Sequence, residues 1–162
     1  MENRQRGYSQ MVVHALHDKG HHVDNVLAEV SDDQLLREVA PGRNRGIDLV
    51  GHLDVLVNSM LPLVGYGENP APYLVEPFVK TPDKQTDDLP TANELRKEWE
   101  KAKTTVEKNI KNTAPGEWFQ KHTSISEEDF AKEPHRNKLN VVLSRASHVD
   151  YHLGQLIFLR TR

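Results

Sequence analysis

Residues 47–65 of the chain read IDLVGHLDVLVNSMLPLVG, and the spacing of their apolar side chains decides the fold class. At about 100° per residue, these side chains gather on one face, which predicts an amphipathic helix over residues 47–64. His52 lies on the flank of that apolar stripe, where a buried core meets solvent. The stripe consists of Leu49, Val50, Leu53, Leu56, Val57, Met60, Leu61 and Val64.

The C-terminal stretch SRASHVDYHLGQLIFLRTR, residues 144–162, has the same character. Its periodicity predicts a helix from about residue 137 to the C-terminus. His148 and His152 lie on the flank of the apolar stripe, and their spacing places both imidazoles on one face, one turn apart. The stripe consists of Val142, Ala146, Val149, Leu153, Leu156 and Ile157.

Two further helices complete the pattern. Thr91, followed three residues later by Glu94, forms a capping box and starts a helix that ends before Pro115. Ser31 resembles the cap of a short turn, and the segments 65–90 and 115–136 are polar connections without a strand pattern. A helix over residues 6–30 is predicted from the repeat of Tyr8, Val12, Leu16, Val23, Val26 and Val30.

Long amphipathic helices without strands predict an all-α four-helix bundle, which we expect to form a single domain over residues 1–162. The first connection is short and the two later ones are long. This pattern does not fit the simplest up-down-up-down bundle, because long connections allow neighbouring helices to run parallel.

Composition narrows the functional classes. The chain has 162 residues, a net charge of −3 and no cysteine, so disulfides, thiolate metal sites and cysteine nucleophiles are excluded. No stripe of Lys and Arg favours nucleic acid as a partner. The N-terminus is polar, and no apolar run approaches the roughly 18 residues that a membrane span needs. We expect a soluble cytoplasmic protein that binds neither nucleic acid nor membrane.

The three flank histidines are the candidate metal ligands. An i,i+4 pair can place two nitrogens on one ion, and a third from a neighbouring helix would leave open coordination positions, as in catalytic metal sites. His52, His148 and His152 have this arrangement. The alternative is that they are partly buried histidines bonded to backbone or to a carboxylate.

Supporting groups follow from sequence spacing. A metal-bound imidazole usually donates its other N–H to an acceptor. Two candidate acceptors are Asp48, one turn before His52, and Gln155, near the side of its helix that carries His148. Both also fit ordinary exposed polar residues. No residue stands out as a general base, so the catalytic residues stay unknown. Asp48, Asp54 and Tyr151 are candidates only by nearness in sequence.

The remaining histidines carry weaker signals. His14, His17 and His21 share a helix face opposite the apolar stripe and are expected to be solvated. Adventitious metal capture or an oligomer contact is the alternative for them. The other three lie at a stripe edge or in a polar loop: His22, His122 and His135.

Two stretches resemble the DinB/YfiT-like superfamily of metal-binding four-helix bundles, which is unrelated to the DNA polymerase of similar name. They are SDDQLLREVAPGRNRGIDLVGHLDVLVNSM around His52 and ASHVDYHLGQL around His148 and His152. The order of helices matches over essentially the whole chain, whereas these motifs cover about a quarter of it.

The resemblance implies an up-down-down-up topology, a divalent ion (zinc or nickel) held by His52, His148 and His152, and a homodimer. Characterised members of the family include thiol-dependent S-transferases, mycothiol-dependent maleylpyruvate isomerases and metal-dependent hydrolases. Some isomerases carry a fused C-terminal domain, which we do not find in this sequence, and that argues against isomerase activity.

We therefore expect a metal-dependent enzyme that activates a low-molecular-weight thiol or water against a small-molecule substrate. The alternative is a non-catalytic metal-binding or stress-response module. A di-iron carboxylate bundle is disfavoured because it needs Glu-x-x-His motifs. The candidate glutamates all lack a His three residues later: Glu29, Glu38, Glu94 and Glu98.

Overall fold

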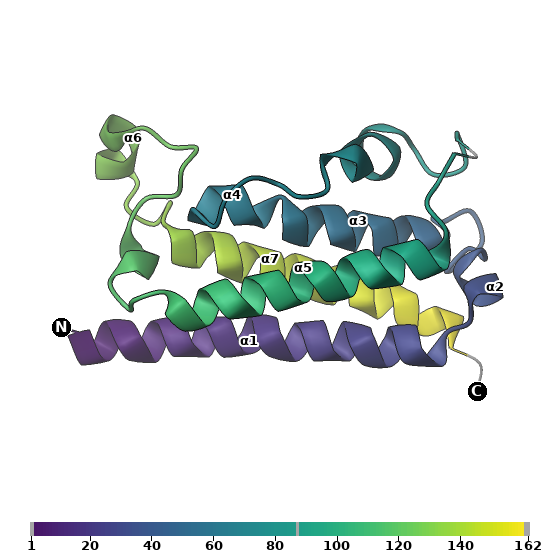
Figure 1. Cartoon of the computed structure of the whole chain (residues 1–162), viewed down its shortest axis with the longest axis horizontal. Coiled ribbons are helices and arrows are strands. Elements are labelled where there is room, and N and C mark those ends of the chain that lie inside the picture. Colours follow the sequence, from purple (N-terminus) through teal and green to yellow (C-terminus); the bar gives the residue numbers. More distant parts are fainter. Residues whose placement is uncertain (1, 87, 161–162) are drawn as a thin grey trace.

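The computed structural model describes residues 2–86 and 88–160, and this part of the chain is helical with no strand. The long helices are α1 (Glu2–Glu29), α3 (Gly46–Asn58), α5 (Ala92–Asn112) and α7 (Lys138–Leu156). They lie side by side in an elongated bundle (Figure 1). The all-α prediction is confirmed for the described residues.

The directions of the helices follow from the chain order in Figure 1. Helices α1 and α7 run from left to right, and α3 and α5 run from right to left. Helix α1 packs chiefly along α7, whereas α3 packs along both α5 and α7. Two helices that are far apart in sequence, α3 and α7, are therefore brought together.

The two long connections are partly helical. Between α4 (Met60–Val64) and α5, the chain forms the 3-10 turn η1 (Pro72–Leu74) and the π-helical turn η2 (Glu76–Lys80), both packed on α3. Between α5 and α7 it forms η3 (Glu117–Phe119) and α6 (Glu127–Lys132). A turn of 3-10 helix, η4 (Ile157–Leu159), follows α7.

Side-chain caps set the starts of three of the helices. Thr91 and Glu94 form the expected capping box at α5. Ser31 and Gln34 form a second one at α2 (Asp32–Leu35), inside the predicted short turn. Asn137 accepts the Asn140 amide hydrogen and so fixes the start of α7.

The prediction of one continuous helix over residues 47–64 is wrong at Ser59. Helix α3 ends at Asn58, and α4 starts at Met60. The cause is Pro62: it has no amide hydrogen to donate to the Asn58 carbonyl, four residues earlier. The break nevertheless leaves every side chain of the predicted 47–64 stripe buried.

Two side chains placed in apolar stripes are exposed instead. Tyr8 is 54% exposed, because the buried face of α1 passes through its neighbour Ser9 in this turn and not through Tyr8. Ile157 is 43% exposed, because the chain leaves the α-helix for η4 at this residue and the side chain rotates off the stripe.

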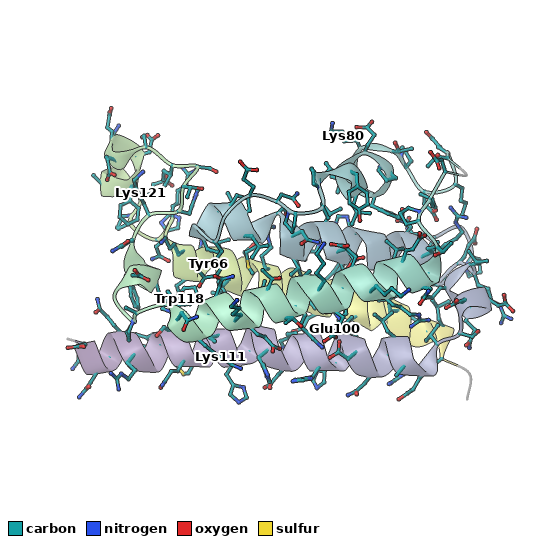
Figure 2. All side chains as sticks on the ribbon, in the orientation of Figure 1. Tyr66, Lys80, Glu100, Lys111, Trp118 and Lys121 are labelled. Carbon is teal, nitrogen blue, oxygen red and sulfur yellow. The ribbon has the colours of Figure 1, made fainter. Side chains whose placement is uncertain are left out.

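Aromatic side chains close one end of the bundle. Tyr66, just after α4, meets Trp118 of η3 edge to face, with ring centroids 6.5 Å apart (Figure 2). The Tyr66 hydroxyl also shares a hydrogen bond with Thr113, at the end of α5. Burial of Trp118 in this contact anchors the second long connection to the core.

The expectation that no apolar run is long enough to span a membrane also needs correction. The segment Gly46–Val64 is long and apolar enough to span a membrane. However, 78% of that window is buried against other parts of the protein. The segment is apolar because it is the central helix of the core.

Candidate metal centre

The structure brings His52, His148 and His152 together where α3 meets α7. The Nε2 atoms of His148 and His152 are 2.9 Å apart. The His52 ring centroid lies 5.3 Å from that of His148 and 4.8 Å from that of His152. Three potential ligand nitrogens, one per histidine, lie within 4.8 Å of one another, and all three residues are partly exposed. We call this group the histidine centre.

The spacing of these nitrogens suits one metal ion. An ion about 2.0–2.1 Å from each nitrogen of a tetrahedral site needs those nitrogens about 3.3 Å apart. The 2.9 Å pair and the 4.8 Å limit bracket that separation, so small side-chain rotations suffice. The group contains no fourth His or acidic ligand among the described residues. Three protein ligands leave coordination positions for water or substrate.

The orientation of His52 is fixed by a backbone carbonyl. Its Nδ1 lies 3.1 Å from the carbonyl oxygen of Phe78 in η2, and since a carbonyl only accepts, Nδ1–H is the donor. The lone pair of a neutral His52 is then on Nε2, as a metal ligand requires. The Phe78 carbonyl is available because η2 ends at Lys80 and Pro82 has no amide hydrogen.

Gly51 lets η2 come this close to α3. A Cβ added at Gly51 would lie 2.5 Å from three ring atoms of Phe78, much closer than ordinary contact. The absence of a side chain therefore allows the Phe78 ring to lie against α3, which places its carbonyl beside His52. This explains why glycine directly precedes the histidine.

Of the two predicted hydrogen-bond acceptors for the imidazoles, one is confirmed and one is wrong. Gln155 does support the centre, but its Oε1 accepts from Nδ1 of His152, at 2.9 Å, rather than serving His148. Asp48 is not the acceptor for His52, whose Nδ1 uses the Phe78 carbonyl instead. The buried Asp48 carboxylate accepts from Asn44, and burial raises its pKa.

The electrostatic environment keeps the α7 histidines neutral. Burial is the main cause that lowers the pKa of His148, with further lowering by His52 and Arg145. Burial also lowers the pKa of His152, only partly opposed by its hydrogen bond to Gln155. Neutral imidazole is the form that binds a metal, so these shifts favour coordination at neutral pH.

The structure separates the candidates for a general base. Asp54 is turned about 200° from His52 around α3, and neither of its buried carboxyl oxygens has a hydrogen-bond partner among the described residues. Burial, followed by the negative charge of Glu98 on α5, raises the Asp54 pKa to about 9, so it is protonated at neutral pH. Tyr151 is 64% exposed and lies beside the centre, its ring centroid 5.0 Å from that of His152.

Arg145 was missed by the sequence reasoning. It lies three residues before His148 on α7, and burial lowers its pKa. Its Nε is buried and has no hydrogen-bond partner among residues 2–86 and 88–160. The signal in the sequence was an arginine at helical spacing from a histidine on the edge of an apolar stripe.

No family model matches the chain, and no curated protein sequence matches it. The histidine centre is thus supported by its own geometry: two helices, three convergent imidazoles and fixed Nδ1 partners for two of them.

Proposed function

We propose that the protein is a DinB/YfiT-like bundle whose His52, His148 and His152 bind one divalent ion, zinc or nickel. The observation that carries this proposal is the convergence of three imidazole nitrogens within 4.8 Å. The up-down-down-up topology is part of the proposal and is supported by the common direction of α1 and α7, opposite to that of α3 and α5 (Figure 1).

The function that we propose is metal-dependent activation of a low-molecular-weight thiol or of water, as in thiol S-transferases and hydrolases. An ion held by three neutral imidazoles keeps its full positive charge and so supplies Lewis acidity, which favours thiolate or hydroxide near neutral pH. The protein supplies the orientation of the ligands: the Phe78 carbonyl holds His52, and Gln155 holds His152.

The substrate that fits this centre is a small anionic molecule. Arg145 places a positive charge near His148, where it lowers the His148 pKa. A carboxylate or phosphate satisfies guanidinium donors better than a neutral group does. Exposed Tyr151 lies on the rim of the centre, where it can contact substrate.

A non-catalytic metal-binding module is the second candidate. The position of the carboxylates favours it: Asp48 is engaged by Asn44, and Asp54 is turned away from the centre. Hydrolysis that relies on a carboxylate base is therefore less well supported than attack by a metal-bound thiolate or hydroxide. A thiolate attacks directly once it is formed.

Dimer formation is also proposed rather than observed. Exposed apolar side chains on α7 and η4 offer a surface for a second copy of the chain. They are Leu143, Tyr151, Ile157 and Phe158.

The test uses protein purified without an affinity tag. Metal analysis is followed by turnover of a thiol with an electrophilic acceptor, and separately of a simple ester. We expect metal-dependent thiol transfer that is lost in the variant His148→Ala/His152→Ala. Metal binding without either reaction would favour the non-catalytic module.

A further inference from the structure

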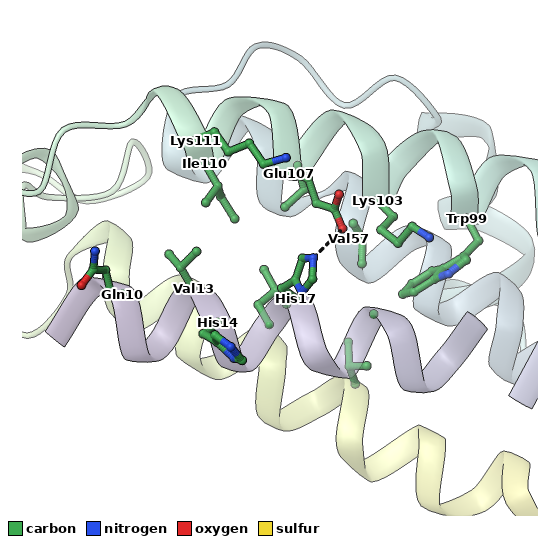
Figure 3. Close-up of a pocket in the computed structure, with 14 residues that line it drawn as sticks. Gln10, Val13, His14, His17, Val57, Trp99, Lys103, Glu107, Ile110 and Lys111 are labelled. Carbon is green, nitrogen blue, oxygen red and sulfur yellow. Dashed lines mark ion pairs between the residues drawn. The ribbon is translucent and has the colours of Figure 1, made fainter. Parts of the chain in front are cut away.

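A second cluster of metal-ligating side chains lies on the other side of the bundle, at a cavity between α1 and α5. The cavity has a volume of about 480 Å³. His17 of α1 and Glu107 of α5 both line it and face each other across the opening (Figure 3). The apolar part of its lining includes Leu16, Val57, Trp99, Val106 and Val149.

His17 and His21 have the same spacing as the α7 pair of the histidine centre. Their Nε2 atoms are 3.2 Å apart, and their rings meet edge to face with centroids 4.3 Å apart. Oε1 of Glu107 lies 3.7 Å from Nε2 of His17. One ligand atom from each of these three residues lies within 4.8 Å of the others. The sequence interpretation treated these histidines as solvated, with adventitious metal capture or an oligomer contact as the alternative, and the cluster favours that alternative.

A carboxylate lies behind one of the two imidazoles: Oδ2 of Asp24 is 3.4 Å from Nδ1 of His21. Asp18 pairs instead with His14, whose Nδ1 lies 2.8 Å from its Oδ2. A carboxylate near Nδ1 favours the tautomer whose Nε2 lone pair is free for a metal. His17 therefore presents Nε2 to Glu107, and the Nε2 of His21 lies beside that of His17 while its Nδ1 faces Asp24.

The carboxylate behind His21 is itself held in place by α5. Asp24 accepts a hydrogen bond of 2.8 Å from Nε1 of Trp99 and one of 2.6 Å from Nζ of Lys103. Because these contacts cross from α1 to α5, they fix the two helices at a separation that suits the cluster. The same contacts therefore keep Glu107 of α5 close to the histidine pair of α1.

From these contacts we propose that His17, His21 and Glu107 form a second divalent-metal site, which joins α1 to α5 at the mouth of the cavity. Two imidazoles and one carboxylate suit zinc, nickel or copper, and three protein ligands leave positions open for water or another ligand. The site shares no residue and no helix with the histidine centre. It does not depend on the proposed function.

The test is a zinc titration of the tag-free, chelator-treated full-length protein, followed by calorimetry. Wild type is expected to bind two equivalents and His17→Ala/His21→Ala one. Glu107→Gln keeps the shape of the side chain and removes its charge, and it should weaken one of the two equivalents about tenfold or more, since even supporting residues contribute this much. The matched control is His14→Ala, which removes a histidine of the same α1 face that lies outside the cluster.

The outcomes separate the two sites. If the histidine centre binds no zinc, wild type binds one equivalent and His17→Ala/His21→Ala binds none, which still supports the second site. Equal stoichiometry in wild type and His17→Ala/His21→Ala would overturn the proposal. So would a Glu107→Gln titration that matches wild type, or a loss in His14→Ala as large as in Glu107→Gln. Helicity measured by circular dichroism identifies any variant that fails to fold, and Glu107→Gln then decides alone.

Discussion

Replacement of Gly51 by alanine tests how the histidine centre is built. The new Cβ would lie 2.5 Å from Cγ, Cδ1 and Cε1 of Phe78, whereas ordinary contacts are 3.4–4 Å, so the ring must move by about 1 Å. Overpacking of this kind costs about 1–3 kcal/mol. The better helix propensity of alanine recovers about 0.5–1 kcal/mol. We expect a net loss of up to about 2.5 kcal/mol, centred on about 1 kcal/mol, in the free energy of unfolding.

The displacement of Phe78 should also weaken metal binding by the histidine centre. Moving Phe78 pulls its carbonyl away from Nδ1 of His52, and loss of such a supporting bond weakens metal affinity about 10–100-fold. The assays are urea denaturation and a zinc titration, both in the His17→Ala/His21→Ala background so that only the histidine centre is measured.

The control for this substitution is Gly154→Ala on α7, where an added Cβ meets nothing within 4 Å. Its helix should gain about 0.5–1 kcal/mol with unchanged zinc affinity. If Gly51→Ala loses stability but binds zinc as tightly as Gly154→Ala does, then Phe78 does not hold His52 in its binding orientation.

Three further predictions follow from the same geometry. Because the buried Asp54 carboxyl has its pKa raised to about 9, it holds a proton that the unfolded chain releases above about pH 4, so this group makes the protein less stable as pH rises from about 4 to 9. Asp54→Asn should therefore be more stable than wild type by up to about 4 kcal/mol at pH 7. Denaturation at pH 5 and pH 8 should show that this difference in stability grows with pH. A constant difference would argue against a protonated Asp54. Zinc affinity of the histidine centre should weaken below about pH 6, since protons compete for His148 and His152; titrations from pH 5 to 8 that show no weakening would contradict a histidine-only centre. Arg145→Gln should raise KM for an anionic thiol substrate about tenfold or more with little change in zinc affinity, because charged hydrogen bonds contribute about 1.5–3 kcal/mol; an unchanged KM would remove Arg145 from substrate binding.

The helices and the histidine trio could be predicted because their signals are periodic. Apolar side chains at helical spacing give α3 and α7, and the flank positions of His52 and His148 give the side of each helix on which a ligand lies. The periodicity alone does not show that the two flanks converge, and this was expected only from the family resemblance. The packing of α3 against α7 accounts for it.

The missed features depend on contacts between segments that are remote in sequence. The hydrogen-bond acceptor for His52 is a backbone carbonyl, which every residue has, so the residue type at Phe78 could not predict it. Glu107 meets His17 only because α5 lies beside α1 at this point, and helical glutamates are too common to single one out. The break at Ser59 is different, because Pro62 and its missing amide hydrogen are features of the sequence itself and suffice to predict it.

The most direct test of the central claim is the position of zinc in crystals of the tag-free protein, located by anomalous scattering at the zinc edge. We expect an ion at the junction of α3 and α7, about 2.0–2.1 Å from one nitrogen each of His52, His148 and His152. An ion that contacts fewer than all three histidines, or zinc found only at other places on the surface, would contradict the account.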